Sequence, residues 1–133
     1  MDCPACRNAM ITLELSDVEI DHCVNCGGIW LDSGELDLLL NDAAKARHLI
    51  DSFVEHESGA EQPRKCPICR RKMARIVVGQ STPPLLIDKC RRNDGLWFDK
   101  NELQDILSRA ELDEHNRIQE VLADMFGRQR PKI

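Results

Sequence analysis

Aromatic residues are scarce in this sequence, and their scarcity limits the hydrophobic core that the chain can build. Only five of the 133 residues are aromatic, and tyrosine is absent. Modules below about 40 residues rarely fold on an apolar core alone and commonly depend on a metal ion. The chain is therefore short for two ordinary domains, but it suits two small modules that metal stabilises.

Long apolar runs are also missing. No segment approaches the roughly 20 apolar residues of a membrane-spanning helix. The first cysteine is Cys3, which leaves no room for a secretory leader before it, so we expect a cytoplasmic protein with no membrane partner. Thiols stay reduced in the cytosol, where regularly spaced cysteines indicate metal binding rather than disulfides.

The chain carries one cysteine frame twice. Each copy has a Cys-x-x-Cys pair, a second cysteine position after an intervening segment, and then the motif Trp-x-Asp-x-x-Glu-Leu. The copies are offset by 63 residues at the first pair and by 67 afterwards, so the second copy has a four-residue insertion, which we place at 79–84. The cysteines of the two copies are Cys3, Cys6, Cys23 and Cys26, and then Cys66, Cys69 and Cys90.

Two Cys-x-x-Cys pairs at this separation are typical of a four-thiolate zinc site. We therefore predict that the first copy binds zinc through all four of its cysteines. A redox dithiol is the alternative interpretation. A redox Cys-x-x-Cys is expected alone at the start of a helix, however, and not opposite a second pair across a hairpin.

The second copy has only three cysteines, because Asn93 occupies the position of Cys26. We expect zinc there as well, since three well-placed thiolates remain. The fourth ligand is open at this stage, because Asn93, Asp94, His115 or a water molecule could supply it. Three protein ligands and a water are also the arrangement of catalytic zinc. The other alternative is a site that has lost its metal and survives on packing.

Apolar and polar residues alternate between the cysteine pairs of each copy. This pattern predicts one β-hairpin over 10–15 and 18–22 and another over 73–78 and 85–89. Each hairpin would carry the chain from one pair of ligand positions to the other.

A helix is predicted after each hairpin. The pattern Asp-x-x-Glu at 32–35 and at 99–102 fits the capping box, in which the aspartate accepts from an early backbone N–H and the glutamate reaches back. Apolar residues continue at helical spacing over 36–54 in the first copy and 103–110 in the second, and they recur in 111–133.

These patterns predict a small α+β, metal-stabilised fold. It would contain two tandem zinc ribbons, each followed by an α-helix, and a C-terminal helix. We place the first ribbon and its helix at 1–54, a polar linker at 55–63, the second ribbon and its helix at 64–110, and a helical tail at 111–133. We expect the two copies to pack together through their helices.

The stretch that begins at Cys23 makes the pattern specific, because it reads Cys-x-x-Cys-Gly-Gly-Ile-Trp-Leu-Asp-Ser-Gly-Glu-Leu. It closely resembles the bacterial and archaeal zinc-ribbon family named for the zinc finger of transcription factor IIB. The resemblance covers Cys3 to about Leu36 and, with the substitution at position 93, Cys66 to about Leu103. It implies that the seven cysteines bind zinc, and it implies no particular reaction.

Trp30 and Trp97 occupy matching positions just before the predicted helices. They could form a stacking platform for a base or a peptide. We favour a core role for both, because a small ribbon with few aromatic residues needs its large side chains inside. The acids of the two capping boxes likewise need no catalytic role.

Charge is unevenly distributed along the chain, whose net charge is −5. Residues 1–63 hold 3 Lys/Arg against 13 Asp/Glu, whereas residues 64–100 hold 10 Lys/Arg against 3 Asp. The acidic total argues against non-specific nucleic-acid binding, but the basic segment favours a local contact with a polyanion.

We therefore predict a non-enzymatic zinc-binding adaptor or regulatory protein whose ribbons present a surface to a protein partner. One alternative is a nucleic-acid-binding, transcription-related accessory factor that uses the basic second ribbon. The other is a zinc or redox enzyme that uses the three-cysteine site. No candidate base or nucleophile clusters near that site in the sequence, which favours the non-enzymatic interpretation.

Overall fold

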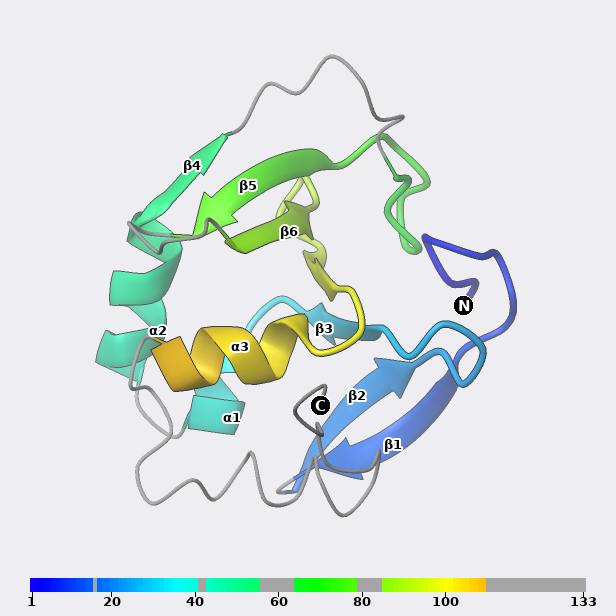
Figure 1. The fold of residues 1–133 in the computed structure, drawn as a ribbon, viewed down its shortest axis with the longest axis horizontal. Helices are drawn as coiled ribbons and strands as arrows, with labels where there is room; N and C mark the ends of the chain where they lie inside the picture. The colour runs from blue at the N-terminus through cyan, green and yellow to red at the C-terminus, as the bar shows by residue number, and fades with distance from the viewer. Residues whose placement is uncertain (16, 41–42, 56–63, 79–84, 110–133) are drawn as a thin grey trace, which may run out of the picture.

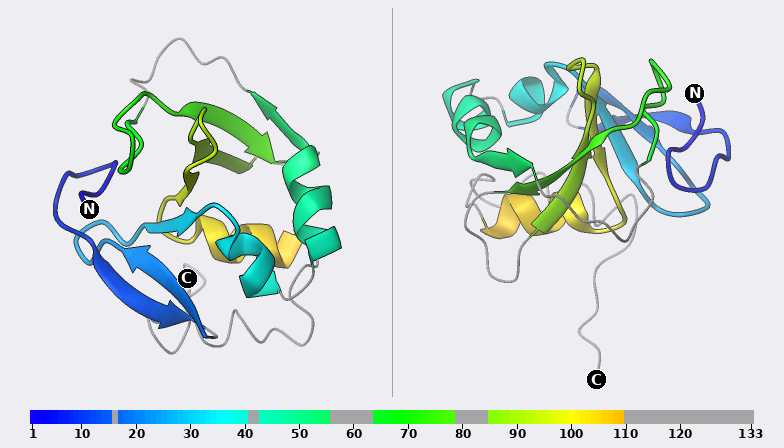
Figure 2. Two further views of the ribbon diagram at one scale, coloured as in Figure 1. Left: turned by 180° about the vertical axis from the view of Figure 1, so that it is seen from behind. Right: turned by 90° about the horizontal axis from the view of Figure 1, so that it is seen from above.

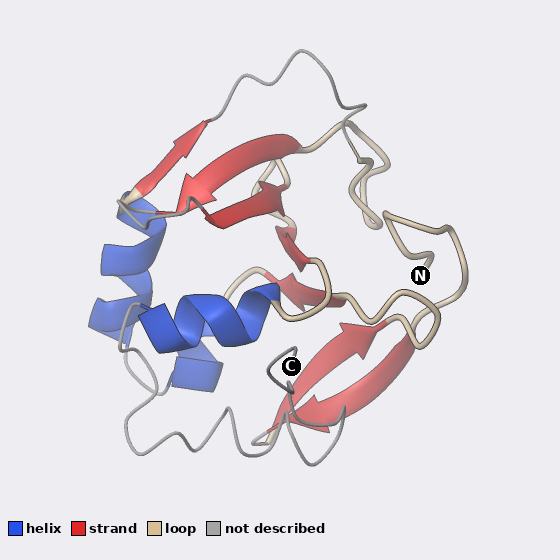
Figure 3. Ribbon diagram, in the orientation of Figure 1, coloured by secondary structure: helices blue, strands red, loops and turns tan. Residues whose placement is uncertain are grey.

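A computed structural model of the chain describes residues 1–15, 17–40, 43–55, 64–78 and 85–109. Figure 3 distinguishes strands from helices and shows the helices gathered on the side of the molecule away from the N-terminus. Within the described ranges, no helix has the length and apolar character needed to cross a membrane. The elements are β1 (Ile11–Leu15), β2 (Val18–His22), β3 (Ile29–Asp32), α1 (Glu35–Leu40), α2 (Ala43–Asp51), β4 (Phe53–Glu55), β5 (Ala74–Val78), β6 (Leu85–Lys89), β7 (Gly95–Phe98) and α3 (Glu102–Arg109).

The strands of these ranges form one antiparallel sheet in the order β1-β2-β3-β7-β6-β5-β4. Both predicted hairpins are confirmed, because β1 pairs with β2 and β5 pairs with β6. Figure 1 shows the two hairpins on opposite sides of β3. The fold is thus a small α+β structure with an antiparallel sheet, as the sequence predicts.

The alternating side chains of the hairpins explain why they pack. In β2, Val18 and Ile20 are buried, whereas Glu19 between them is exposed. In β5, Ala74, Ile76 and Val78 are buried in the same alternation. One face of each hairpin therefore contributes to the core, as the period of two requires.

The two copies are joined through strands β3 and β7. Trp30 lies opposite Trp97, and the pairs on either side are Ile29 with Phe98 and Leu31 with Leu96. Because Trp30 and Trp97 occupy matching positions, the pairing is symmetric about them, like the isologous contact of a dimer. The copies are thus joined by a strand junction, which our expectation of packing through helices did not include.

Helices of both copies share one apolar core with the sheet. Leu36 and Leu39 of α1 and Leu49 of α2 lie in the same buried cluster as Leu103 and Ile106 of α3. Burial of such side chains contributes about 1.5–3 kcal/mol each. The two cysteine frames therefore lie in one packed body rather than in separate modules.

The end of the first predicted helix differs from the prediction. The chain forms α1 and α2 over this range, and Val54, which we assigned to the helix, lies in strand β4 opposite Val77 of β5. The predicted boundary between the first ribbon and the linker thus falls inside β4. The rest of the predicted linker, the insertion at 79–84 and the tail at 111–133 lie outside the described residues.

Candidate metal centres

Short hydrogen-bonded turns, which we call knuckles, hold the cysteines. The Cys3 carbonyl accepts from the Arg7 N–H at 2.9 Å, and the Cys66 carbonyl accepts from the Arg70 N–H at 2.8 Å. Arg7 and Arg70 have φ angles of 67° and 62°, so each turn ends in the left-handed region. Backbone N–H groups also point at sulfur, as from Ala5 to Cys3 Sγ at 3.3 Å.

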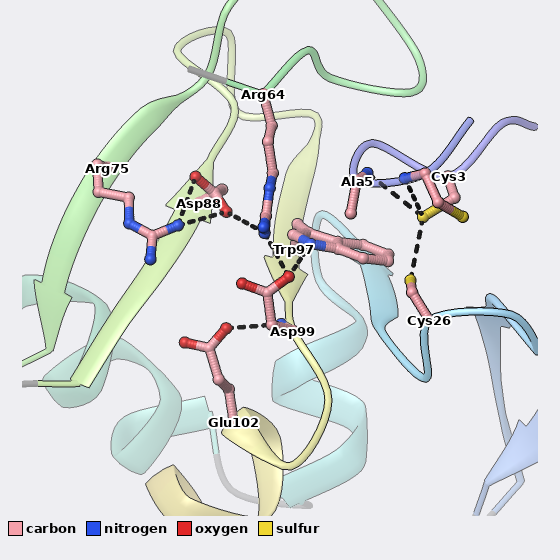
Figure 4. A network of polar contacts seen from close by, with 10 residues as sticks. Cys3, Ala5, Cys26, Arg64, Arg75, Asp88, Trp97, Asp99 and Glu102 are labelled. Atoms are coloured by element: carbon pink, nitrogen blue, oxygen red, sulfur yellow. Dashed lines mark hydrogen bonds and ion pairs between the residues drawn. The ribbon is translucent and has the colours of Figure 1, made fainter. Parts of the chain in front are cut away.

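In the first copy the four thiols converge. Cys3 Sγ lies 3.4 Å from Cys26 Sγ (Figure 4). Cys6 Sγ lies 3.4 Å from Cys23 Sγ. All four sulfur atoms lie within 4.8 Å of one another. Tetrahedral thiolates bind zinc at about 2.3 Å and therefore lie about 3.8 Å apart. This centre is compatible with zinc.

In the second copy, three thiols converge with a carboxylate. Cys69 Sγ lies 3.7 Å from Cys90 Sγ. Oδ2 of Asp94 lies 3.4 Å from Cys90 Sγ and 3.7 Å from Cys66 Sγ. The four donor atoms lie within 4.8 Å of one another, which is also compatible with zinc. Among the alternatives for the fourth ligand, the geometry favours Asp94.

Asp94 reaches the thiols because the last knuckle turns one residue earlier than its counterpart. In the first copy, the Gly27 N–H donates to the Cys23 carbonyl at 2.8 Å, and Gly27 has a φ of 83°. In the second copy, the Asn93 N–H donates to the Cys90 carbonyl at 3.1 Å, and Asn93 has a φ of 61°. Asparagine tolerates this left-handed conformation better than most residues. Residue 94 rather than residue 93 then faces the thiols.

The other candidates for the fourth position have different surroundings. Oδ1 of Asn93 accepts from Lys89 Nζ at 2.7 Å. His115 lies outside the described residues. His22, which is not one of these candidates, is a buried residue of β2 with Nδ1 3.0 Å from the Gly28 carbonyl, and burial lowers its pKa. Within the described residues, neither metal cluster includes a histidine.

Burial sets the ionisation of the thiols. It raises the pKa of Cys3 and Cys26, and it raises the pKa of Cys66 to about 12. The pKa of Cys6 is instead lowered to about 6, chiefly by a hydrogen bond from the Asn8 backbone. A divalent cation binds the thiolate form and so offsets the cost of burying it. Bound zinc would crosslink the two knuckles of each copy and contribute directly to folding.

The tryptophans pack across the junction between the copies. A Cβ atom added to Gly28 would lie 2.2 Å from Cζ2 of Trp97, and one added to Gly95 would lie 2.6 Å from Cζ2 of Trp30. Each indole therefore covers the glycine of the other copy, and both indoles are 0% exposed. This confirms the core role of Trp30 and Trp97. The sequence shows both glycines, but it does not show that an indole from the other copy requires them.

The two metal clusters adjoin the same indoles. The thiols of both copies belong to one buried cluster with Trp30, Trp97 and Met73. Figures 1 and 2 show the N-terminal segment beside the segment that precedes β5, so the first knuckles of the two copies are neighbours. The two centres are thus parts of one structural unit.

Each centre is also held by a residue of the other copy. A Cβ atom on Gly27 would lie 3.0 Å from Cγ of Lys100, so the Lys100 stem covers the second knuckle of the first centre. The Ser33 N–H donates to the Asp94 carbonyl at 2.9 Å. Ser33 and Lys100 occupy matching positions in the two copies. The sequence pattern alone gives no role to Ser33 or Lys100, yet each of them contacts a knuckle of the other copy.

The capping-box acids have structural partners. The Asp32 N–H donates to Glu35 Oε1 at 2.5 Å, and the Asp99 N–H donates to Glu102 Oε1 at 2.7 Å, so the glutamates reach back as predicted. Each aspartate carboxylate also accepts from the indole two residues earlier, at 2.7 Å in the first copy and 3.0 Å in the second. Burial raises the pKa of Glu35 to about 7 and that of Glu102 to about 8.

An ionic network surrounds the second tryptophan (Figure 4). Asp88 is 2% exposed, and its carboxylate pairs with Arg75 at 3.2 Å and with Arg64 at 3.5 Å. Arg64 also pairs with Asp99. Burial raises the pKa of Asp88, while both arginines oppose this shift. Part of the basic segment therefore neutralises the buried Asp88 and the partly exposed Asp99.

Comparison with known proteins identifies the first copy. Residues 2–42 match the family described as transcription factor zinc-finger, with a zinc ribbon of the transcription factor IIB type. No match was found among curated proteins or among solved structures. The likeness of the second copy rests on its own cysteine cluster. The family match therefore covers the first copy, with its four converging thiols, and less than half of the chain.

Proposed function

We propose that this chain is a non-enzymatic zinc-binding adaptor or regulatory protein built on two tandem zinc ribbons. One observation carries the proposal: the Asp94 carboxylate lies among the three thiols of the second copy. With it, that copy has four protein donors, which leaves a four-coordinate zinc no position for a reacting water. Both centres would then be structural, and the protein would act through the surface that they hold.

The assignment of a second ribbon is supported by matched local structure. Cys3 N–H donates to the Asn8 carbonyl and Cys66 N–H donates to the Arg71 carbonyl, both at 2.8 Å. The hairpins that follow have the same length and pairing. A replaced ligand in an otherwise equivalent frame is what we expect of a second copy that still binds metal.

The redox alternative is less well supported by the thiol geometry. The short Sγ–Sγ distances join cysteines of different knuckles, as in Cys3 with Cys26 and Cys69 with Cys90. A redox dithiol would instead be expected within one Cys-x-x-Cys pair. The arrangement therefore favours a shared ion at the centre of four donors.

Two measurements test the proposal. Native mass spectrometry of the full chain should count two zinc ions. Zinc-loaded protein used as bait in extract of its host, with nuclease present, should retain a protein that the chelated bait loses. A count of zero zinc ions would contradict the adaptor function. So would a captured protein that is retained when nuclease is omitted and lost when nuclease is present.

A nucleic-acid-binding accessory factor is the second candidate. Exposed cations of the second copy favour it, namely Lys65, Arg70, Arg71, Lys72 and Arg92. The buried indoles argue against it, because proteins that bind single strands commonly stack bases on exposed aromatic rings. Retention on DNA or RNA that weakens steeply with salt would favour this candidate over the adaptor.

A further inference from the structure

The first knuckles of the two copies have the same backbone and different surfaces. A pair of isolated bridges, Asp2 with Ala9 and Lys65 with Lys72, closes the two knuckles in the same way. Four surface positions differ between them, from first copy to second: Asp2 to Lys65, Ala5 to Ile68, Asn8 to Arg71, and Ala9 to Lys72. The first knuckle is therefore an internal reference for what the fold itself requires.

The cations of the second knuckle are exposed, and the described part of the chain places no acid in an ion pair with them. Lys65, Arg70, Arg71 and Lys72 are all exposed, and none has an ion pair within the described residues. The acids of 64–100 are engaged elsewhere, since Asp88 and Asp99 pair with arginines and Asp94 faces the thiols. The knuckle thus carries local positive charge that is available to a partner.

The metal does not explain this charge. Four thiolates, or three thiolates and a carboxylate, have the same formal charge around a divalent ion. The first centre has the same charge as the second, yet its knuckle carries Asp2, Asn8 and Ala9 where the second carries cations. Compensation of the metal centre would predict similar knuckles, which is not what the chain has.

An apolar side chain stands among these cations. Ile68 is 46% exposed, and its counterpart in the first copy is the small Ala5. The knuckle is rigid around it, because Arg70 N–H donates to the Cys66 carbonyl and Met73 N–H to the Arg64 carbonyl, both at 2.8 Å. A rigid apolar residue in a charged ring can bind a partner at little entropic cost.

We infer that this tip patch, which comprises Lys65, Ile68, Arg70, Arg71 and Lys72, binds an acidic protein segment that carries an apolar side chain. The carboxylates would meet the lysine and arginine side chains, and the apolar residue would cover Ile68. The inference rests on the proposed adaptor function and names the partner class for one part of its surface. Nucleic acid fits less well, because phosphates would leave Ile68 uncovered and the knuckle offers no aromatic ring.

A pair of exchange variants tests the patch. The loss variant gives the second knuckle first-copy residues, through Lys65→Asp, Ile68→Ala, Arg71→Asn and Lys72→Ala. The gain variant makes Asp2→Lys, Ala5→Ile and Ala9→Lys in the first knuckle. Each residue already occurs on this backbone in the other copy, and a zinc count with a circular dichroism spectrum verifies that both variants fold.

Three probes are titrated onto the zinc-loaded full chain. They are a synthetic peptide of glutamates with two leucines, the same peptide with serines in place of the leucines, and a short single-stranded oligodeoxythymidylate. We expect the leucine peptide to bind the native chain more tightly than the other two probes do. Its affinity for the loss variant should be weaker than for the native chain by about tenfold or more, and its affinity for the gain variant should be tighter than for the native chain.

Other results would overturn the inference. These are equal binding of the two peptides, peptide binding that the loss variant leaves unchanged, or tighter binding of the oligonucleotide with the same dependence on the patch. The adaptor function is judged separately. If the host protein captured by the native bait is retained equally by the loss variant, the adaptor function stands and this patch is not its surface.

Discussion

One cross-strand position shows how differently the two copies use the same fold. In the first copy, Thr12 Oγ1 donates to Asp21 at 3.1 Å, and Asp21 is partly exposed. In the second copy the equivalent pair is Arg75 with Asp88, and Asp88 is 2% exposed. A carboxylate in water needs only a hydroxyl partner, whereas a buried one needs a cation. The basic character of the second copy is therefore partly a consequence of what it buries.

The metal centres teach a related lesson. The first centre has four sulfur donors, and the second replaces one with the carboxylate of Asp94. The exchange is possible because the backbone turn shifts by one residue while the frame from Cys90 to Gly95 keeps its length. In both copies a backbone hydrogen bond still closes the knuckle. The Cys23 N–H donates to the Gly28 carbonyl, and the Cys90 N–H donates to the Gly95 carbonyl, each at 3.1 Å.

Loss of a thiol from the first centre should have the largest effect. We expect Cys23→Ser to remove zinc from that centre and to unfold the chain, because both copies share one core. Metal binding in small zinc peptides is on the order of 10–16 kcal/mol, which is comparable with the total stability of a domain. Native mass spectrometry and circular dichroism measure the result. The exposed neighbour Val24→Ser is the control, and a folded Cys23→Ser protein with two zinc ions would contradict the prediction.

The junction between the copies should be the next most sensitive feature. Gly28→Val should destabilise the fold by roughly 3 kcal/mol, because its side chain would overlap the Trp97 indole. The matched control is Gly34→Ala. Gly34 has a φ of 90°, but a Cβ atom added there would have no neighbouring heavy atom within 4 Å, so this variant should lose only about 1 kcal/mol through backbone strain. Denaturant midpoints compare them. Equal losses for the two variants would show that the indole contact contributes little.

The fourth ligand of the second centre can be tested by exchange of two neighbouring residues. We expect Asp94→Asn to lower the affinity of this centre for zinc by about 10–100-fold. Loss of a residue that only hydrogen-bonds to a metal ligand already has an effect of this size. Asn93→Cys restores the sequence pattern of the first copy, yet it should not tighten binding, because residue 93 lies in the turn. Chelator competition measures the affinity. Tighter zinc in Asn93→Cys and unchanged zinc in Asp94→Asn would assign the ligand position to residue 93.

The smallest effect concerns pH. Burial, with repulsion from Asp99, raises the pKa of Glu102 from an ordinary 4.5 to about 8. Between these values the folded chain keeps a proton that the unfolded chain has lost, so the contribution of Glu102 to stability falls as pH rises through this window. Glu102→Gln removes the ionisation and can still accept from Asp99.

We therefore expect the variant to gain roughly 1 kcal/mol over the native chain at pH 9, and less at pH 6. Thermal unfolding at the two pH values measures the difference. The matched variant is Glu35→Gln. Burial raises the pKa of Glu35 to about 7, so the gain of this variant should level off at lower pH than that of Glu102→Gln. A gain that is the same at both pH values would attribute the effect to packing rather than ionisation.

Local patterns predicted the local structure well. The hairpins and the glutamates that reach back at both helix starts are as expected, because each depends on residues close in sequence. The tryptophans are buried as expected, although each packs against the glycine of the other copy. Strand β4 was missed, since Val54 fits a helical period as well as it fits a strand. Its assignment depends on β5 of the other copy, which no local pattern shows.

The sequence by itself determined that thiols would meet in two places, because Cys-x-x-Cys turns joined by a hairpin bring their ligands to one centre. Only the tertiary structure decided that the two frames form one sheet, that each tryptophan covers the glycine of the other copy, and that Asp94 rather than Asn93 faces the second set of thiols. The reason is that strand pairing between copies, steric fit of an indole and a shift of one residue in a turn all depend on atoms that are distant in sequence or on backbone angles that spacing does not specify.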